Sequence, residues 1–201
     1  MNTYTVVDVE TSGLSPARGR IVEIGLLLLN EQGEVIDSFE SLVDPQGSVG
    51  ATYIHGITAS MVKDAPLFSS LMGDIIPFFR DSVMVAHNVP FDKRFLISEF
   101  SRAGVHVGNI PSICTLELSR RFFSHLPSRS LSPMCSFLGI EAGRSHTALD
   151  DCRAAASLFQ ILRRRIAEEN LELGRFIRGD QAPEWPALES SGQFLTRSSL
   201  S

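Results

Sequence analysis

The sequence predicts an α/β protein in which a sheet of five short strands is flanked by helices. Residues 21–29 and 34–43 are strand-like and are joined by the turn sequence Asn-Glu-Gln-Gly, which predicts a hairpin. Three further short strand patterns alternate with helical patterns, and a long amphipathic helix follows them. With 201 residues and 43% hydrophobic content, the chain can build one sizeable core but not two.

The first predicted strand, residues 3–10, carries two acids near its end. Threonine, tyrosine and valine favour an extended strand, and alternation sends Asp8 and Glu10 to the same face. Turn residues follow at once, so the pair lies at the strand end, where sites in open α/β sheets are found. A like-charged pair there is costly unless solvent, a proton or a cation offsets it. Two solvated acids remain the alternative.

The predicted hairpin contains one acid in an apolar setting. Residues 21–29 form an almost unbroken apolar run, which predicts a central strand buried on both faces, whereas residues 34–43 are more polar. Glu23 interrupts the run. It is interpreted as a structural hydrogen-bonding residue, with a supporting role near a metal site as the alternative.

The middle of the chain alternates loops, helices and strands. Residues 53–58 predict a loop in which His55 is typical of a surface histidine, and Thr58 or Ser60 is expected to cap a short helix. Residues 66–80 predict a helix that Pro77 should shorten or kink. The other predicted elements are a buried strand at 82–86, a helix at 90–103, a strand at 110–115, and helices at 116–123 and 132–138. Asp92 lies in the first turn of its helix, where an acid can also serve only the helix dipole.

The last long helix distinguishes between two adjacent acids. At about 100° per residue, Asp151 falls within the apolar stripe that includes Ala155 and Phe159, while Asp150 lies about 100° away at its edge. Asp151 is therefore predicted to face the core, where the start of the helix could bring it to the first strand. A capping role for Asp151 is the structural alternative.

The charge and composition of the chain limit its expected partners, cellular location and domain organisation. The net charge of −5 argues against a polyanionic partner unless four of the carboxylates bind cations. The three cysteines lack zinc spacing, and no signal peptide, membrane span or Ser-His-Asp grouping is found, so a cytoplasmic protein without membrane contact is expected. Residues 1–170 are predicted as one domain and 171–201 as a loosely ordered tail, with Trp185 in a partner-binding peptide as the alternative.

Three segments occur in the order and with the internal spacing of a known family. They are Asp8-Val-Glu10 with Thr-Ser-Gly-Leu after it, His87-Asn-Val-Pro-Phe-Asp92, and His146-Thr-Ala-Leu-Asp-Asp151. Residues 3–166 thereby resemble the DEDDh family of 3′–5′ exonucleases, in particular the proofreading epsilon subunits of bacterial replicative polymerases. The resemblance implies a ribonuclease H-like fold, with a mixed five-stranded sheet in the order 3-2-1-4-5, one strand antiparallel.

The resemblance also implies roles for individual residues. Asp8, Glu10, Asp92 and Asp151 would be ligands of two Mg²⁺ or Mn²⁺ ions, and His146 would be the general base. Carboxylates are hard ligands that suit these ions, and histidine can accept a proton near neutral pH. Contacts with the substrate are implied, less directly, for Thr11, Leu14, His55, Asn88 and Phe91.

The implied activity is metal-dependent hydrolysis of single-stranded DNA from its 3′ end, releasing nucleoside 5′-monophosphates, with proofreading beside a DNA polymerase subunit as one setting. An exoribonuclease or oligoribonuclease is the alternative within the same chemistry, because the motifs address phosphate rather than sugar. A non-catalytic nucleic-acid-binding or polymerase-binding module is the alternative of another class. The sequence leaves the oligomeric state open.

Overall fold

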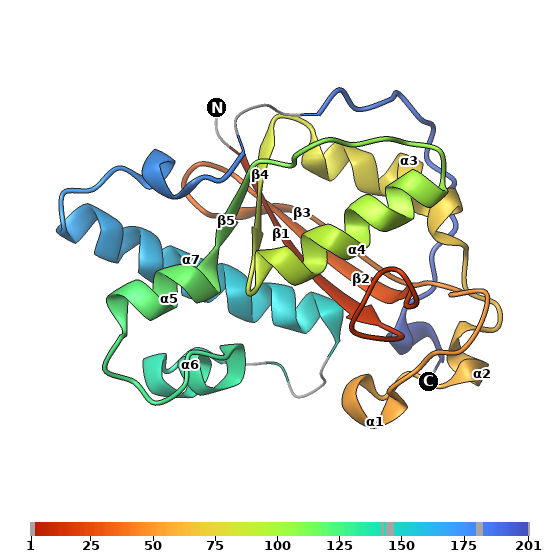
Figure 1. Cartoon of the computed structure of the whole chain (residues 1–201), viewed down its shortest axis with the longest axis horizontal. Coiled ribbons are helices and arrows are strands. Elements are labelled where there is room, and N and C mark those ends of the chain that lie inside the picture. The colour runs from red at the N-terminus through yellow and green to blue at the C-terminus, as the bar shows by residue number, and fades with distance from the viewer. Residues whose placement is uncertain (1–2, 142, 144–146, 180–182, 201) are drawn as a thin grey trace.

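Figure 1 shows the computed structural model, which describes residues 3–141, 143, 147–179 and 183–200. Its centre is a five-stranded sheet in the order β3-β2-β1-β4-β5. The strands are β1 (Thr3–Thr11), β2 (Ile21–Leu29), β3 (Val35–Leu42), β4 (Ser82–Ala86) and β5 (Ser112–Cys114). β2 is antiparallel to both of its neighbours, while β1, β4 and β5 run parallel, so the mixed sheet with one antiparallel strand is confirmed.

Helices cover both faces of the sheet. They are α1 (Thr52–His55), α2 (Ala59–Val62), α3 (Phe68–Phe79), α4 (Val89–Arg102), α5 (Thr115–Phe122), α6 (Leu131–Leu138) and α7 (Ala148–Glu168), with 3₁₀ turns η1 (Leu173–Phe176) and η2 (Arg197–Leu200). α3 and α4 pack on one face, and α5, α6 and α7 pack on the other (Figure 1). In the part of the chain that the structure describes, no helix is both long and apolar enough to cross a membrane.

The alternation of β1 decides which face each side chain meets. Val7 and Val9 join the core under α3 and α4, whereas Tyr4 and Val6 join the core under α7. Asp8 continues the second series, as β-strand geometry requires. The acids at the end of β1 therefore lie on the side of the sheet that α7 covers.

Two local predictions need adjustment. Residues 53–58 were expected as a loop, but the short helix α1 covers 52–55 and ends at Gly56, whose φ of 74° is readily adopted by glycine. Pro77 lies inside α3, which ends two residues later at Phe79. The effect of the proline is limited because so little helix remains after it.

The C-terminal segment lies along the fold rather than away from it. The ring of Trp185 lies 5.6 Å from that of Phe79 and 5.3 Å from that of Phe100. Further along, the amide of Leu42 donates a 2.6 Å hydrogen bond to the carbonyl of Leu195. A serine-rich composition predicts loose order, but a few isolated apolar residues provide this packing. The boundary of the domain at residue 170 stays a prediction.

Candidate active site

The end of β1 and the start of α7 bring three carboxylates together. Oxygens of Asp8, Glu10 and Asp151 all lie within 4.8 Å of one another, and the three side chains are partly exposed. The helix-face assignment made from the sequence is confirmed, because Asp151 points to the β1 acids. Asp150 instead forms an ion pair of 2.8 Å with Arg153.

A fourth carboxylate approaches from the other layer of helices. Asp92 lies in the first turn of α4 and is 4% exposed. Its Oδ1 accepts a 3.3 Å hydrogen bond from the amide of Val9, between the two acids of β1. Pro90 at the start of α4 suits the first turn of a helix, and Asn88 before it adopts a positive φ of 103°. This sharp entry into the helix brings Asp92 to the end of β1.

Crowding and burial make these acids hard to ionise. Burial, followed by the charges of Asp92, Asp151, Glu10 and Glu23, raises the pKa of Asp8 well above its ordinary value. Burial and the neighbouring Glu23 and Asp151 raise the pKa of Glu10 to about 7. Burial, with Glu10 as a further cause, raises the pKa of Asp92 to about 8. A divalent cation would offset this repulsion, and hard carboxylate oxygens are the ligands that Mg²⁺ and Mn²⁺ prefer.

A cavity adjoins the carboxylates. It measures about 230 Å³ and is lined by Asp8, Asp151, His87, Ser132 and residues of α6 and α7. His87 is half-buried, and both of its ring nitrogens have partners: Nδ1 lies 2.9 Å from Thr115 Oγ1 and Nε2 lies 2.9 Å from the carbonyl oxygen of Arg129. The cavity offers room for a phosphate group beside the acids.

His146 lies outside the described residues, so its place relative to the acids stays a prediction. The helix that follows it is well defined at its start. The Thr147 side chain accepts a 3.1 Å hydrogen bond from the amide of Asp150, which is a regular helix cap. The capping residue is thus Thr147, and Asp151 remains directed to the other acids.

The residues with implied substrate contacts fall into two groups. Leu14 is 84% exposed and Asn88 is exposed, so both are accessible to a ligand. Thr11 is partly exposed and donates a 2.8 Å hydrogen bond to the carbonyl of Gly13. Phe91 is half-buried, with its ring 5.1 Å from that of Phe95.

His55 is not a surface histidine, so that expectation is wrong. It is 3% exposed, its Nδ1 accepts a 3.0 Å hydrogen bond from the amide of Ile57, and its Nε2 lies 3.2 Å from the carbonyl oxygen of Val49. Burial lowers the pKa of His55, which favours the neutral ring. The ring stabilises the loop, while its neighbours Tyr53 and Ile54 are 90% and 62% exposed.

Two residues near the carboxylates carry structural contacts. Glu23, opposite Glu10 in the strand pairing, is fully buried and accepts hydrogen bonds from the amide of Ala148 and from Arg197. These contacts confirm that Glu23 is a hydrogen-bonding residue, as predicted. Because one of them is to the first residue of α7, the alternative of a supporting role near a metal site stays a prediction. Arg197 could not be found from the sequence, because no local pattern relates it to a strand 174 residues earlier.

Comparisons with known proteins agree with this geometry. Residues 5–159 match the RNase T family model, described as an exonuclease. DNA polymerase III of the PolC type from Bacillus cereus is 36% identical over 172 residues, and that from Bacillus subtilis is 34% identical over 173. Each match covers 85% of this chain but only 12% of the polymerase. The chain therefore spans about an eighth of the length of these relatives.

Solved structures share the fold. Exonuclease X in complex with 5′-overhanging duplex DNA has a TM-score of 0.65 and 26% identity, covering 88% of this chain and 97% of that one. Escherichia coli exonuclease I with a dT13 oligonucleotide has a TM-score of 0.76 and 19% identity, covering 85% and 43%. The nuclease domain of 3′hExo, a DEDDh family member bound to rAMP, has a TM-score of 0.69 and 19% identity, covering 89% and 97%.

Proposed function

Because the chain belongs to the DEDDh family of exonucleases, we propose that it hydrolyses single-stranded DNA from the 3′ end and releases nucleoside 5′-monophosphates. The observation that carries the proposal is the convergence of Asp8, Glu10 and Asp151 within 4.8 Å, with Asp92 buried at the same strand end. Acids from three separate elements meet there although their mutual repulsion is unfavourable. Bound cations would offset this repulsion, so the arrangement favours a metal-binding site.

The proposed roles follow from the chemistry of the side chains. Asp8, Glu10, Asp92 and Asp151 would hold two Mg²⁺ or Mn²⁺ ions. When bound, such a pair supplies positive charge for the attacking and leaving oxygens of the phosphodiester. His146 would accept the proton of the attacking water, since imidazole titrates near neutral pH. The buried faces of β1 and α7 hold the acids in place.

The substrate would approach over exposed apolar side chains. The backbone of Gly50 packs directly against that of Ser12, so the loop before α1 adjoins the segment after β1. Leu14 in the segment after β1, and Tyr53 and Ile54 in α1, have exposed side chains. Apolar and aromatic side chains can stack on nucleobases without selecting a sequence. We therefore assign Leu14 and Thr11 to the terminal nucleotide, with Asn88, Phe91 and the His55 loop as further contacts.

The setting we propose is replication. The PolC relatives support a role in proofreading beside a polymerase, with residues 1–170 as the exonuclease domain. A ribonucleotide substrate is the competing assignment, since the structural neighbour 3′hExo holds rAMP.

A direct assay uses matched DNA and RNA oligonucleotides of one sequence, each labelled at the 5′ end. With Mg²⁺, the labelled DNA is expected to shorten step by step, because nucleotides leave from the unlabelled 3′ end. Chelation should stop the reaction. Asp151→Asn should stop it as well, whereas Asp150→Asn, the adjacent acid that pairs with Arg153, should retain most of the activity.

The alternatives give different outcomes. Faster shortening of the RNA would replace the DNA assignment with an exoribonuclease. Release of a labelled mononucleotide at the start of the reaction would reverse the direction. No cleavage of either polymer, with binding retained, would favour the non-catalytic module.

A further inference from the structure

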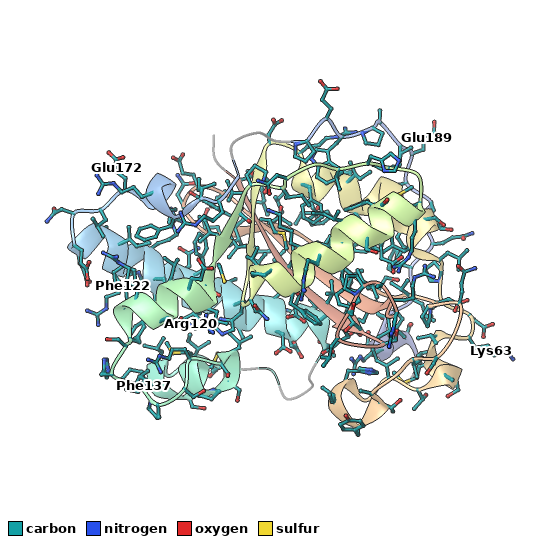
Figure 2. The ribbon with its side chains drawn as sticks, in the orientation of Figure 1. Lys63, Arg120, Phe122, Phe137, Glu172 and Glu189 are labelled. Atoms are coloured by element: carbon teal, nitrogen blue, oxygen red, sulfur yellow. The ribbon has the colours of Figure 1, made fainter. Side chains whose placement is uncertain are left out.

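The C-terminal segment returns to the sheet beside the candidate active site. Figure 2 shows Glu189 on this segment above α3. Its carbonyl lies where a side chain on Gly73 would be, so the glycine lets the segment pass close to the helix. The segment then contacts the end of β3, where the Leu195 amide donates a 3.1 Å hydrogen bond to Ser41 Oγ. The contacts with α3 and β3 bring the last turn of this segment, η2, next to β2.

Arg197, the first residue of η2, makes a forked contact with Glu23. Its Nε lies 2.7 Å from one carboxylate oxygen and a terminal nitrogen lies 2.8 Å from the other. The remaining terminal nitrogen donates a 2.8 Å hydrogen bond to the carbonyl of His55. The Glu23 side chain is 0% exposed and that of Arg197 is 18% exposed, so the pair is largely shielded from water. Planar guanidinium groups suit this two-point contact better than lysine does.

Glu23 in turn contacts the helix that carries Asp151. Its Oε2 accepts a 3.0 Å hydrogen bond from the amide of Ala148, the first residue of α7. At the same place α7 lies directly on β2, because a Cβ on Gly25 would come within 2.5 Å of the Ala148 carbonyl carbon. The amide of Ala148 is one of the first-turn donors without a partner inside the helix. Glu23 therefore fixes the position of the first turn of α7.

We propose that Arg197 is a positioning residue for the metal-binding carboxylates: by holding Glu23, it fixes the start of α7 and so places Asp151 opposite Asp8 and Glu10. The inference rests on the proposed metal-dependent function. It extends the proposed exonuclease unit beyond residue 170, so that it includes the C-terminal segment with Arg197.

Charge alone predicts the opposite effect, which makes the inference testable. Arg197 brings a positive charge close to Glu10. Its removal would leave the site more negative, and by Coulomb's law a cation would then bind more tightly. Loss of positioning would make the cation bind more weakly. The sign of the change in affinity distinguishes the two effects.

The experiment titrates Mn²⁺ into the full chain by calorimetry and measures hydrogen exchange at the Ala148 amide. Arg197→Ala is expected to raise the Kd for Mn²⁺ about tenfold, as loss of a residue supporting metal ligands commonly does, and to speed exchange at Ala148. Arg197→Lys keeps the charge but loses the fork, so a smaller rise in Kd is expected. Arg153→Ala removes a nearby charge that does not contact Glu23, so its Kd should be unchanged or lower.

The outcomes separate the inference from the function on which it rests. Wild-type affinity in both Arg197 variants, or tighter binding in Arg197→Ala, would overturn the positioning role. If Arg197→Ala does not melt cooperatively, the Kd of Arg197→Lys for Mn²⁺ alone tests the positioning role. A wild-type protein that binds no Mn²⁺, or one whose binding survives Asp151→Asn, would instead refute the proposed function.

Discussion

Replacing Glu10 with glutamine is expected to stabilise the metal-free protein at pH 8. Burial and the charges of Glu23 and Asp151 raise the pKa of Glu10 from its ordinary 4.5 to about 7. Between these values the folded protein holds a proton that the unfolded chain releases, so the free energy of unfolding falls as the pH rises. At about 1.4 kcal/mol per pKa unit, the loss is about 3 kcal/mol and is complete above pH 7.

Glutamine cannot ionise, so the variant avoids this loss. At pH 4.5 and below, where Glu10 is protonated, the two proteins should be similarly stable. At pH 8 in the presence of a chelator, Glu10→Gln should be more stable by about 3 kcal/mol. Urea unfolding followed by circular dichroism measures both values. Glu172→Gln, at an exposed position on the far end of the molecule (Figure 2), provides the control and should leave the pH dependence unchanged.

Divalent cations should reverse the order of stability. A ligand that binds only the folded state adds to its stability in proportion to the logarithm of its concentration over Kd. Wild-type protein should therefore gain more from Mg²⁺ at pH 8 than Glu10→Gln does. A stability difference between the two metal-free proteins that is the same at pH 4.5 and pH 8 would refute the reasoning.

Three further substitutions test separate parts of the site. Asp151→Ala should abolish nuclease activity while Asp150→Ala retains most of it; equal losses in the oligonucleotide assay would contradict the assignment of the helix face. Gly25→Ala should lower both thermal stability and Mn²⁺ affinity, since its Cβ would lie 2.5 Å from the Ala148 carbonyl carbon; an unchanged melting temperature would show that α7 can shift freely. Leu14→Ala should raise KM for single-stranded DNA about tenfold, because the proposed contact with the substrate is lost. Its stability should not change, since this side chain is 84% exposed and packs on little else. An unchanged KM would remove Leu14 from the substrate contacts.

Local patterns in the sequence predicted most of the sheet. The apolar run of β2 and the turn after it predicted the hairpin, and the observed bounds of β2 and β4 equal the predicted ones. β5 was predicted as six residues and has three. Short strands are difficult to delimit, because their ends depend on pairing with a neighbour rather than on local propensity.

The directions of two acids of the site could be predicted from the sequence, whereas the contacts that surround them could be predicted only in part. Asp8 and Asp151 lie in regular elements, so alternation along a strand and the period of a helix gave their directions. The network around Glu23 and Arg197 was only half predictable. A buried glutamate in an apolar strand requires a partner, but the partner lies in a segment whose composition resembles a disordered tail. The burial of His55 was not predicted either. Its ring nitrogens contact Val49 and Ile57 within the same segment, and the distant Arg197 donates a hydrogen bond to its backbone carbonyl.

Anomalous scattering from a crystal of the full chain soaked in Mn²⁺ tests the gathering of the acids most directly. Two peaks about 3.5–4 Å apart, within coordination distance of Asp8, Glu10, Asp92 and Asp151, are expected. A crystal that shows no manganese at the end of β1, or manganese bound elsewhere with these carboxylates apart, would contradict the site.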